Sequence, residues 1–341
     1  MNELPEIFNL YRPEIDTEMK SIIDKGELPL YDMLKYHMGW IDEEGNSGTF
    51  NKGKFLRATL CILSCISTGI DYKKALPIAA SIELIHNFSL IHDDIQDNDI
   101  QRRHRPTLWY IWGKPQAINA GTTMKVLANL AILELQKYNV SSDKQIEVFK
   151  ILNESCLTML EGQYLDISFE DKSDVSPDDY ITMIEKKTAA LIEGALLIGA
   201  VLNLKNKDII PFKVFGNYLG IAFQIRDDIL GIWGDEDMTG KPHASDIRKK
   251  KKSLPIIFAL EQSGLKIKND LRRIYAGKKI NENQVGKILD YLEIVKAKDF
   301  CEEKCRQYYE LAIKEVENLP VFGVYTQSYY DIASFLLIRD F

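Results

Sequence analysis

The chain has 341 residues, a formal net charge of −7 and 45% hydrophobic residues, an ordinary globular composition with enough length for a large core. The negative charge argues against a general nucleic-acid-binding surface. No apolar run reaches the ~20 residues that span a bilayer, so we expect no transmembrane segment. The acidic start lacks the apolar stretch of a signal peptide, and we therefore expect a cytoplasmic protein.

Helical periodicity runs through most of the chain, with apolar residues at three-to-four spacing and almost no alternating strand pattern. The clearest segments are 55–70, 75–95, 123–138, 145–167, 180–202 and 211–232. Several of them are apolar on most faces, which is typical of helices buried by other helices. There is no Pro/Ser-rich linker and no short-period repeat, so we expect one all-α domain over residues 1–341, a bundle of about a dozen helices.

The cysteines do not suggest a structural metal. There are five, and two pairs lie four residues apart within helical patterns, Cys61 with Cys65 and Cys301 with Cys305. A zinc site needs four ligands at defined spacing, and no histidine joins either pair. We expect thiols in a reducing compartment.

Three carboxylates gather where the predicted helix 75–95 ends. Asp93 and Asp97 share a helical face and Asp94 flanks them. Like charges at this spacing destabilise a helix by about 0.2–0.5 kcal/mol per pair, and a divalent cation reverses that cost. Oxygen ligands with open positions suit Mg²⁺, although a solvated acidic helix end is the simpler alternative. We call these residues the first aspartate motif.

The same pattern returns at the end of the predicted helix 211–232. Asp227 and Asp228 form a second aspartate motif behind another apolar helix. Two such helix ends that face each other across a bundle could hold several metal ions between them.

A third acidic stretch has an alternative interpretation as a calcium loop. Its residues at positions 1, 3, 5, 6 and 12 of that pattern are Asp235, Asp237, Thr239, Gly240 and Asp246. Position 12 lacks the usual bidentate Glu, and Pro242 interrupts the loop, so the pattern argues weakly for calcium.

Basic residues occur beside the acidic ones and also upstream. They are Lys54, Arg57, Arg102, Arg103, Arg105, Lys186, Lys187, Lys241 and the run Arg248–Lys252. Each group alone is also typical of a solvated surface, but Arg and Lys are the usual ligands of phosphate oxygens. Two acidic helix ends, several cationic groups and an apolar interior together indicate a substrate with a diphosphate head and a hydrocarbon tail. The Gly-rich loop of P-loop enzymes and kinases is absent from the sequence.

The motifs resemble, in the same order, those of the trans-isoprenyl diphosphate synthases, the polyprenyl synthetases that make geranylgeranyl and farnesyl diphosphate. The resemblance starts near residue 50, with core motifs over 50–260: GKFLR, HDDIQD with RRHRPT, KKTAAL, FQIRDD and TGKPHASDIRKKKKSLP. It implies the isoprenoid synthase fold around a central apolar cavity, a homodimer, and Mg²⁺-dependent head-to-tail condensation of isopentenyl diphosphate with an allylic diphosphate.

The resemblance also implies roles for individual residues. Three Mg²⁺ ions are expected per active site, two held by Asp93, Asp94 and Asp97 and a third by Asp227 with Asp228. The residues expected at the allylic diphosphate are Arg102, Lys187, Lys241 and Lys251. Those expected at isopentenyl diphosphate are Lys54, Arg57, His86 and Arg103. Thr188 and Gln224 are expected to line the carbocation site.

The second aspartate motif departs from the family pattern, which ends in a third aspartate where this chain has Gly231. Asp235, one turn further on, is a candidate substitute. The departure leaves two alternatives open: a class I terpene cyclase on the same fold, or a regulatory subunit of a prenyl synthase. The basic residues expected at isopentenyl diphosphate argue against both, because a cyclase does not need them.

Product length is expected to depend on the helix that carries the first aspartate motif. Phe88 lies five residues before Asp93, about 7.5 Å along a helix axis. In the family an aromatic residue here acts as a floor that limits elongation, and the next residue, Ser89, is small. This favours geranylgeranyl diphosphate (C20), with farnesyl diphosphate (C15) next. The simpler interpretation is that Phe88 belongs to the core.

Overall fold

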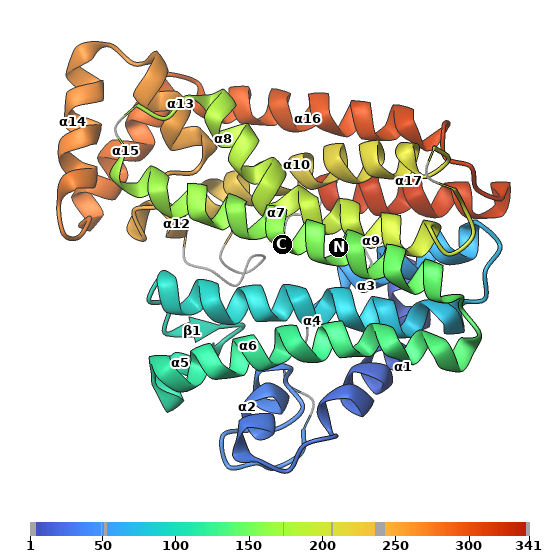
Figure 1. Cartoon of the computed structure of the whole chain (residues 1–341). Helices are drawn as coiled ribbons and strands as arrows, with labels where there is room; N and C mark the ends of the chain where they lie inside the picture. The colour runs from blue at the N-terminus through green and yellow to red at the C-terminus, as the bar shows by residue number, and fades with distance from the viewer. Residues whose placement is uncertain are drawn as a thin grey trace.

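The computed structural model describes residues 5–48, 50, 53–172, 174–205, 207–235 and 243–338. The predicted all-α fold is confirmed, because the structure is 76% helical with almost no strands (Figure 1). The first half contains α1 (Glu6–Ile23), α2 (Pro29–His37), α3 (Leu56–Ser67), α4 (Tyr72–Gln96), β1 (Gln101–Arg102), β2 (Arg105–Pro106), α5 (Leu108–Trp112), α6 (Lys114–Ala131), the 3₁₀ segment η1 (Ile132–Tyr138) and α7 (Ser142–Asp171). The second half contains α8 (Pro177–Ile184), the π-helical turn η2 (Glu185–Ala189), α9 (Ala190–Ala200), α10 (Ile210–Trp233), α12 (Ser245–Arg248), α13 (Leu254–Gln262), α14 (Leu265–Ala276), α15 (Glu282–Ile294), α16 (Ala297–Val316) and α17 (Gly323–Ile338).

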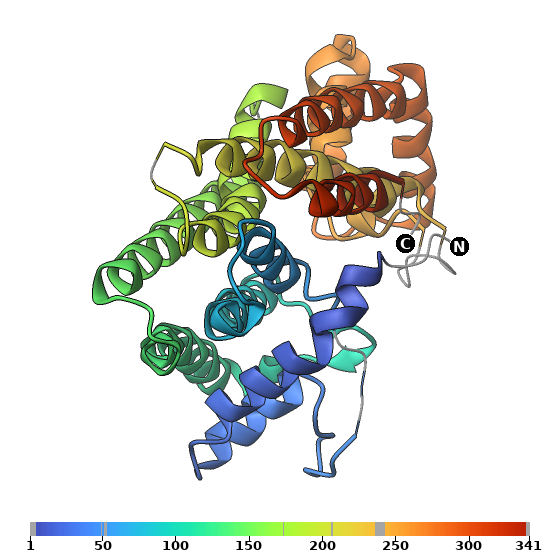
Figure 2. The same cartoon turned by 90° about the vertical axis from the view of Figure 1, so that its right-hand side faces the viewer.

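The most apolar helices lie at the centre of the bundle, as their sequence pattern predicts. Every residue of α3 is buried, and in α9 only Glu193 is not. Figure 2 looks along several helices and shows α3 and α4 surrounded by α1, α6, α7 and α9. The apolar core continues from there into a cluster around α8, α10, α13 and α16, and then into the group α12–α15.

Small residues let the central helices approach closely. A Cβ built on Gly199 of α9 would overlap the Oγ of Ser64 and the carbonyl oxygen of Cys61, both on α3. On α7, a Cβ on Gly162 would lie 2.5 Å from the Cα of Lys187. These two positions therefore require glycine because backbones meet there.

The segment predicted as one helix over 180–202 is divided in the structure. It consists of α8, the π-helical turn Glu185–Ala189 and α9. A π-helical turn inserts an extra residue per turn, which the apolar periodicity of the sequence does not reveal. The turn presses against α7 at Gly162 and carries Lys187 and Thr188.

A short antiparallel hairpin follows α4 and was not expected from the sequence. Arg102 pairs with Arg105, and the two residues between them, Arg103 and His104, have φ angles of 52° and 62°. Two consecutive positive φ angles are typical of the tight type I′ turn. The hairpin reverses the chain and returns Arg102 to the end of α4.

Both motif-bearing helices run toward the same end of the molecule. In Figure 1, α4 and α10 extend from the right to the left, where β1 and α12 lie. A groove of about 620 Å³ between α7, η2, α9 and α10 includes none of the motif aspartates. The central apolar cavity expected from the family stays a prediction.

Replacement of Gly199 tests the close approach of α3 and α9. Gly199→Ala forces a methyl group into the backbone of Cys61, so the free energy of unfolding should fall by about 1–3 kcal/mol. Gly286→Ala is the matched control, because apart from its own helix backbone no described atom lies within 4 Å of its Cβ position in α15; it should be neutral or stabilising by up to ~1 kcal/mol. Urea unfolding followed by circular dichroism measures both. Equal stabilities of Gly199→Ala and the wild type would contradict the packing described.

Candidate active site

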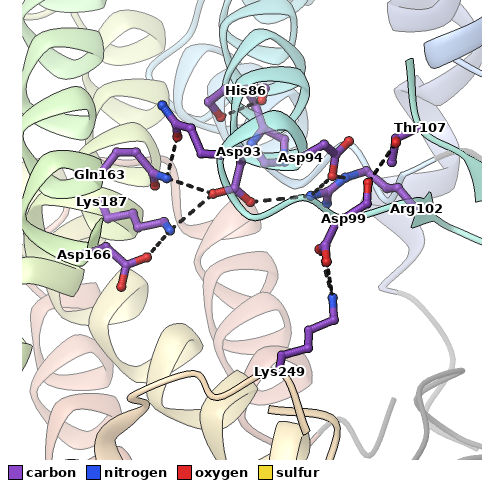
Figure 3. Close-up of polar contacts among 12 residues, drawn as sticks. His86, Asp93, Asp94, Asp99, Arg102, Thr107, Gln163, Asp166, Lys187 and Lys249 are labelled. Carbon is purple, nitrogen blue, oxygen red and sulfur yellow. Dashed lines mark hydrogen bonds and ion pairs between the residues drawn. The ribbon is translucent and has the colours of Figure 1, made fainter. Parts of the chain in front are cut away.

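The first aspartate motif lies at the C-terminal end of α4, where Arg102 of the hairpin contacts two of its carboxylates. Arg102 Nε donates to Asp94 Oδ1 at 2.8 Å, and its Nη2 lies 3.5 Å from Asp93 Oδ2 (Figure 3). Asp94 is only 2% exposed. Burial raises the pKa of Asp94 to about 6 in spite of the adjacent guanidinium. Asp94 therefore mainly fixes Arg102.

Asp93 makes contacts with two further elements, α7 and the π-helical turn. Gln163 Nε2 donates to Asp93 Oδ1 at 3.1 Å, and Lys187 Nζ lies 3.4 Å from the same oxygen. Lys187 also donates to Asp166 Oδ2 at 2.5 Å (Figure 3). Burial alone would raise the pKa of Asp93, but Lys187 and Arg102 outweigh it and hold that pKa below its usual value.

Asp97 is the carboxylate of this motif that faces solvent. It is exposed at the C-cap of α4. Loss of hydration and the charge of Asp93 raise the pKa of Asp97 to about 7. The negative end of the helix dipole adds to this crowding of negative charge. The site is therefore short of positive charge at Asp97.

The second aspartate motif divides its two carboxylates between different environments. Asp228 is 1% exposed and accepts hydrogen bonds from Tyr180 Oη at 2.6 Å, Gln224 Nε2 at 3.0 Å and the backbone N of Leu254 at 3.3 Å. Burial raises its pKa to about 6. Three of roughly four lone-pair sites on this carboxylate are thus occupied by the protein. Asp227, next to it, is half-buried.

The two residues expected at the carbocation site contact each other. Thr188 Oγ1 donates to Gln224 Oε1 at 2.8 Å, and the amide nitrogen of Gln224 donates to Asp228. The π-helical turn is thereby connected to the second aspartate motif.

Lys251 connects the two aspartate motifs electrostatically. Burial would lower its pKa, but Asp246, Asp228, Asp166 and Asp93, in decreasing order, raise it above the usual value. Since Asp93 lies on α4 and Asp228 on α10, the charges of both motifs contribute to the raised pKa of Lys251. A second link is the ion pair between Lys249 Nζ and both oxygens of Asp99, at 2.6 and 2.8 Å (Figure 3).

Of the four residues expected at isopentenyl diphosphate, Arg57 and Arg103 lie near enough to His86 for their charges to affect it. Arg57 is 8% exposed, and its Nε has no hydrogen-bond partner among the described residues. Burial, followed by the charges of Arg57 and Arg103, lowers the pKa of His86 well below its usual value, so the imidazole is neutral at pH 7. A Cβ on Gly53 would lie 2.7 Å from Nη2 of Arg103, which places Arg103 against the GKFLR segment. Lys54 Nζ lies 5.2 Å from the centre of the Phe335 ring.

The two residues expected to set product length lie on α4 between these groups. Phe88 is 6% exposed and packs edge-on against His92, with ring centres 4.8 Å apart. The hydroxyl of Ser89 donates to the carbonyl oxygen of His86 at 2.7 Å.

Four residues of the site were not anticipated from the sequence: Gln163, Asp166, Tyr180 and His37. Gln163 and Asp166 are polar residues three apart on α7, a spacing that could have drawn attention to a shared face. His37 on α2 is half-buried, and loss of hydration around its ring, followed by the charges of Arg103 and Arg102, lowers its pKa to about 3. No local signal marks His37 or Tyr180.

Lys241 and most of the proposed calcium loop lie outside the described residues. Asp235, at the end of the described segment before them, is exposed. Among the described helices, none is both long and apolar enough to cross a membrane, in line with the sequence expectation. The cytoplasmic location stays a prediction.

Comparison with known proteins gives the family of this chain. Residues 39–292 match the family model of polyprenyl synthetase. The chain is 36% identical over 259 residues to a (2E,6E)-farnesyl diphosphate synthase of Mycobacterium tuberculosis, which covers 76% of this chain and 71% of the relative. It is 36% identical over 270 residues to a geranylgeranyl diphosphate synthase of Saccharolobus solfataricus, covering 79% and 81%.

Solved structures agree with this. A polyprenyl synthetase from Streptomyces coelicolor superposes with a TM-score of 0.91 at 32% identity, covering 97% of this chain and 99% of that one. A geranylgeranyl pyrophosphate synthetase from Pyrococcus horikoshii gives 0.87 at 31% identity, with 98% of each chain covered. The predicted isoprenoid synthase fold is confirmed, and the chain belongs to the polyprenyl synthetase family, the trans-isoprenyl diphosphate synthases.

Proposed function

We propose that this short-chain trans-prenyltransferase condenses isopentenyl diphosphate with an allylic diphosphate and makes geranylgeranyl diphosphate (C20), with farnesyl diphosphate (C15) the next candidate. The observation that carries the proposal is the π-helical turn between the two motifs: Lys187 Nζ lies 3.4 Å from Asp93 of the first motif, and the next residue, Thr188, donates to Gln224, which donates to Asp228 of the second. Two acidic helix ends joined by one turn that carries a lysine are suited to a diphosphate held between them.

The residues around the first motif fit a divalent metal ion. Carboxylate oxygens are the ligands that Mg²⁺ prefers, and it usually keeps positions for water and substrate phosphate. Among the described residues, no three His, Cys, Asp or Glu side chains are already arranged to hold a metal ion. The neighbouring carboxylates nevertheless repel the charge of Asp97 and raise its pKa, and a bound cation would offset this repulsion. We therefore propose Asp93 and Asp97 as the main ligands of the first motif.

In the second motif, Asp227 is the better candidate ligand. Asp228 already accepts three hydrogen bonds from the protein and is buried, whereas Asp227 beside it is half-buried. The earlier assignment of Asp94 and Asp228 as metal ligands stays a prediction. Mg²⁺, when bound, supplies positive charge that stabilises the pyrophosphate leaving group.

The cations of the chain provide the rest of the charge at the allylic diphosphate. Lys187 and Arg102 are held in place by carboxylates before substrate binds, and Lys251 is proposed to add a third positive charge. Preorganised cations aimed at a developing negative charge lower the barrier to its formation. Their role is to stabilise the departing diphosphate while the allylic carbon becomes a cation. The oxygens of Thr188 and Gln224 are proposed to lie near that carbon.

Isopentenyl diphosphate is proposed to bind at Lys54, Arg57, His86 and Arg103. Arg57 is buried with a free Nε donor, as stated above, and a buried donor without a partner indicates an anion. His86 contributes a hydrogen bond without adding charge to the guanidinium groups around it. This second anion site favours elongation over the cyclase alternative, since a cyclase takes one diphosphate substrate.

A product assay tests the proposal. The purified chain receives ¹⁴C-isopentenyl diphosphate, Mg²⁺ and each allylic diphosphate in turn, and labelled C20 or C15 diphosphate is expected. Removal of Mg²⁺ with EDTA should abolish product, and added Mg²⁺ should restore it. Labelled cyclic hydrocarbon would indicate the cyclase alternative, and product only after a partner is added would indicate the regulatory subunit.

Phe88 is expected to limit product length. Phe88→Ala removes a buried ring next to His92 and opens space along α4, so products longer than those of the wild type should appear in the mass spectrum. Phe322→Ala, which removes an exposed ring beyond α16, is the control and should leave the product unchanged. Identical product lengths for Phe88→Ala and the wild type would reject this role.

We also propose a homodimer formed through α6, η1 and α7. Half of the large exposed apolar side chains lie on these elements: Ile118, Val126, Leu130, Leu133, Ile146, Phe149, Leu157, Leu160, Tyr164 and Ile167. A patch of this extent is typical of an interaction surface. Figure 2 shows α6 and α7 on the same side of the molecule.

Light scattering should therefore give twice the chain mass of 39.1 kDa. The double variant Leu130→Glu/Leu157→Glu should shift the protein toward the monomer, because it places charges on the apolar surface. The control Leu265→Glu changes an even more exposed leucine on α14 and should remain dimeric. A wild type with the mass of one chain would contradict the dimer.

A further inference from the structure

One surface of the molecule carries a charge opposite to that of the chain as a whole. The chain has a formal net charge of −7, yet residues 265–280 contain six basic residues and one acidic residue. The basic residues are Lys266, Lys268, Arg272, Arg273, Lys278 and Lys279. They lie on α14 and on the loop that follows it, and all except the half-buried Lys268 are exposed. The segment lies beyond residue 260, where the family motifs of the chain end.

The acidic residue of this segment does not cancel the positive charge on its outer face. The carboxylate of Asp270 is ion-paired with Arg273 and with Lys287 of α15, and it accepts a hydrogen bond from Tyr291 Oη at 2.7 Å. Its side chain is only 11% exposed, because it faces α15. The outer face of α14 therefore presents cations with no exposed carboxylate of its own.

An apolar side chain stands among these cations. Leu265, the first residue of α14, is 79% exposed. Apart from its chain neighbours, no described atom lies within 4 Å of a Cβ built on Gly264, so the start of α14 projects from the molecule. At 3.6 residues per turn, Arg272 lies two turns after Leu265 on the same face. The buried residues of α14 are Leu271, Ile274 and Tyr275. This helix is thus amphipathic, with a basic outer face that includes an exposed leucine.

This basic surface adjoins the end of the molecule where the aspartate motifs lie. Lys250, in the turn after α12, donates to the carbonyl oxygen of Gly277, just past the end of α14, at 2.6 Å. Its neighbour Lys249 is ion-paired with Asp99, which follows the first aspartate motif. In Figure 1, α14 forms the left edge of the molecule, at the end where α12 and β1 lie. A ligand broad enough to cover α14 would therefore lie beside this end of the site.

We propose that residues 265–280 dock the protein on the surface of an anionic phospholipid bilayer. Lysine and arginine side chains near such a surface are attracted to its phosphates, and a leucine on the same face enters the boundary between headgroups and acyl chains. Nucleic acid fits less well. Its phosphate backbone offers no apolar contact for Leu265, and the aromatic residue of α14 that could stack on a base, Tyr275, is buried.

The chemistry of the proposed product agrees with this partner. A prenyl diphosphate joins an anionic head to a long hydrocarbon tail, so a bilayer is the phase into which it partitions. Docking through α14 places the motif-bearing end of the molecule next to that phase. This link to the product rests on the proposed function, whereas the docking surface itself does not. The surface is also separate from the apolar side chains of α6, η1 and α7 that are proposed to form the dimer.

Vesicle binding tests the proposal. The full chain is sedimented with vesicles of phosphatidylcholine alone, or of phosphatidylcholine with phosphatidylglycerol, at low and at high KCl. Affinity for the anionic vesicles should be at least about tenfold higher, and high salt should remove most of this difference because it screens the charges. Equal affinity for the two kinds of vesicle, or no binding to either, would overturn the proposal.

Removal of two charges locates the surface. Lys266→Gln/Lys279→Gln should weaken binding to the anionic vesicles about twentyfold, since each cation near the surface contributes about fivefold. The matched control Lys205→Gln/Lys207→Gln removes two exposed lysines between α9 and α10, far from the motif-bearing end of α10, and should stay within about twofold of the wild type. Equal weakening in both double variants would mean a general effect of net charge and would overturn the assignment to α14.

The leucine provides a test that leaves the charge unchanged. Leu265→Ser should weaken binding to the anionic vesicles about tenfold, because an apolar side chain no longer enters the lipid. Leu28→Ser, at a leucine that is 65% exposed before α2, is the control and should bind as the wild type does. Unchanged binding of Leu265→Ser would overturn the role of the leucine, and tighter binding of the wild type to a DNA duplex than to the vesicles would overturn the choice of a bilayer. A wild type that forms no prenyl product would overturn the proposed function, while vesicle binding would still decide this inference.

Discussion

The rest of the structure depends on one constraint: negative charge is concentrated at the C-terminal ends of two helices. The aspartates of α4 stand at the negative end of the helix dipole and repel one another. Three basic side chains offset this negative charge, and each of them lies on a segment of irregular backbone. Arg102 comes from the tight hairpin, Lys187 from the π-helical turn and Lys251 from the turn after α12. The aspartates of the two motifs thus lie on regular α-helices, whereas the basic residues lie on a hairpin, a π-helical turn and a loop turn.

The paired aspartates of each motif do not act as equals. Successive residues on an α-helix point about 100° apart, so two neighbours cannot face the same point. In the first motif Asp94 is buried against Arg102, while Asp93 meets Lys187 and Gln163. In the second, Asp228 is surrounded by protein donors, while Asp227 is less buried. One carboxylate of each pair is thus fully buried among protein groups, and its neighbour is less buried.

The sequence predicts the helices and both motifs because these signals are local: apolar spacing marks the helices, and clustered aspartates mark their ends. It does not predict Gln163, Tyr180 or His37, whose roles depend on which helices meet. The π-helical turn at Lys187 is also hidden, since a single inserted residue leaves the apolar pattern nearly unchanged. Gly231 is a second example of a contact that the sequence does not reveal. Its absence of a side chain is visible in the sequence, but the carboxylate that fills the space comes from another helix, α12.

Helix α4 sets the spacing of the whole proposed reaction. His86 and Asp93 are seven residues apart, about 10 Å along the axis, and are the residues of α4 proposed for the two diphosphate sites. Phe88, between them, is the residue proposed to limit the product. Because one rigid helix carries all three, the distance between the two diphosphates and the depth available to the growing chain cannot vary independently. The buried surroundings of α4, with Glu83 beside Arg57 near its middle, keep that helix in one position. If the proposed roles of His86, Phe88 and Asp93 hold, substrate spacing and product length both follow from the same packed helix.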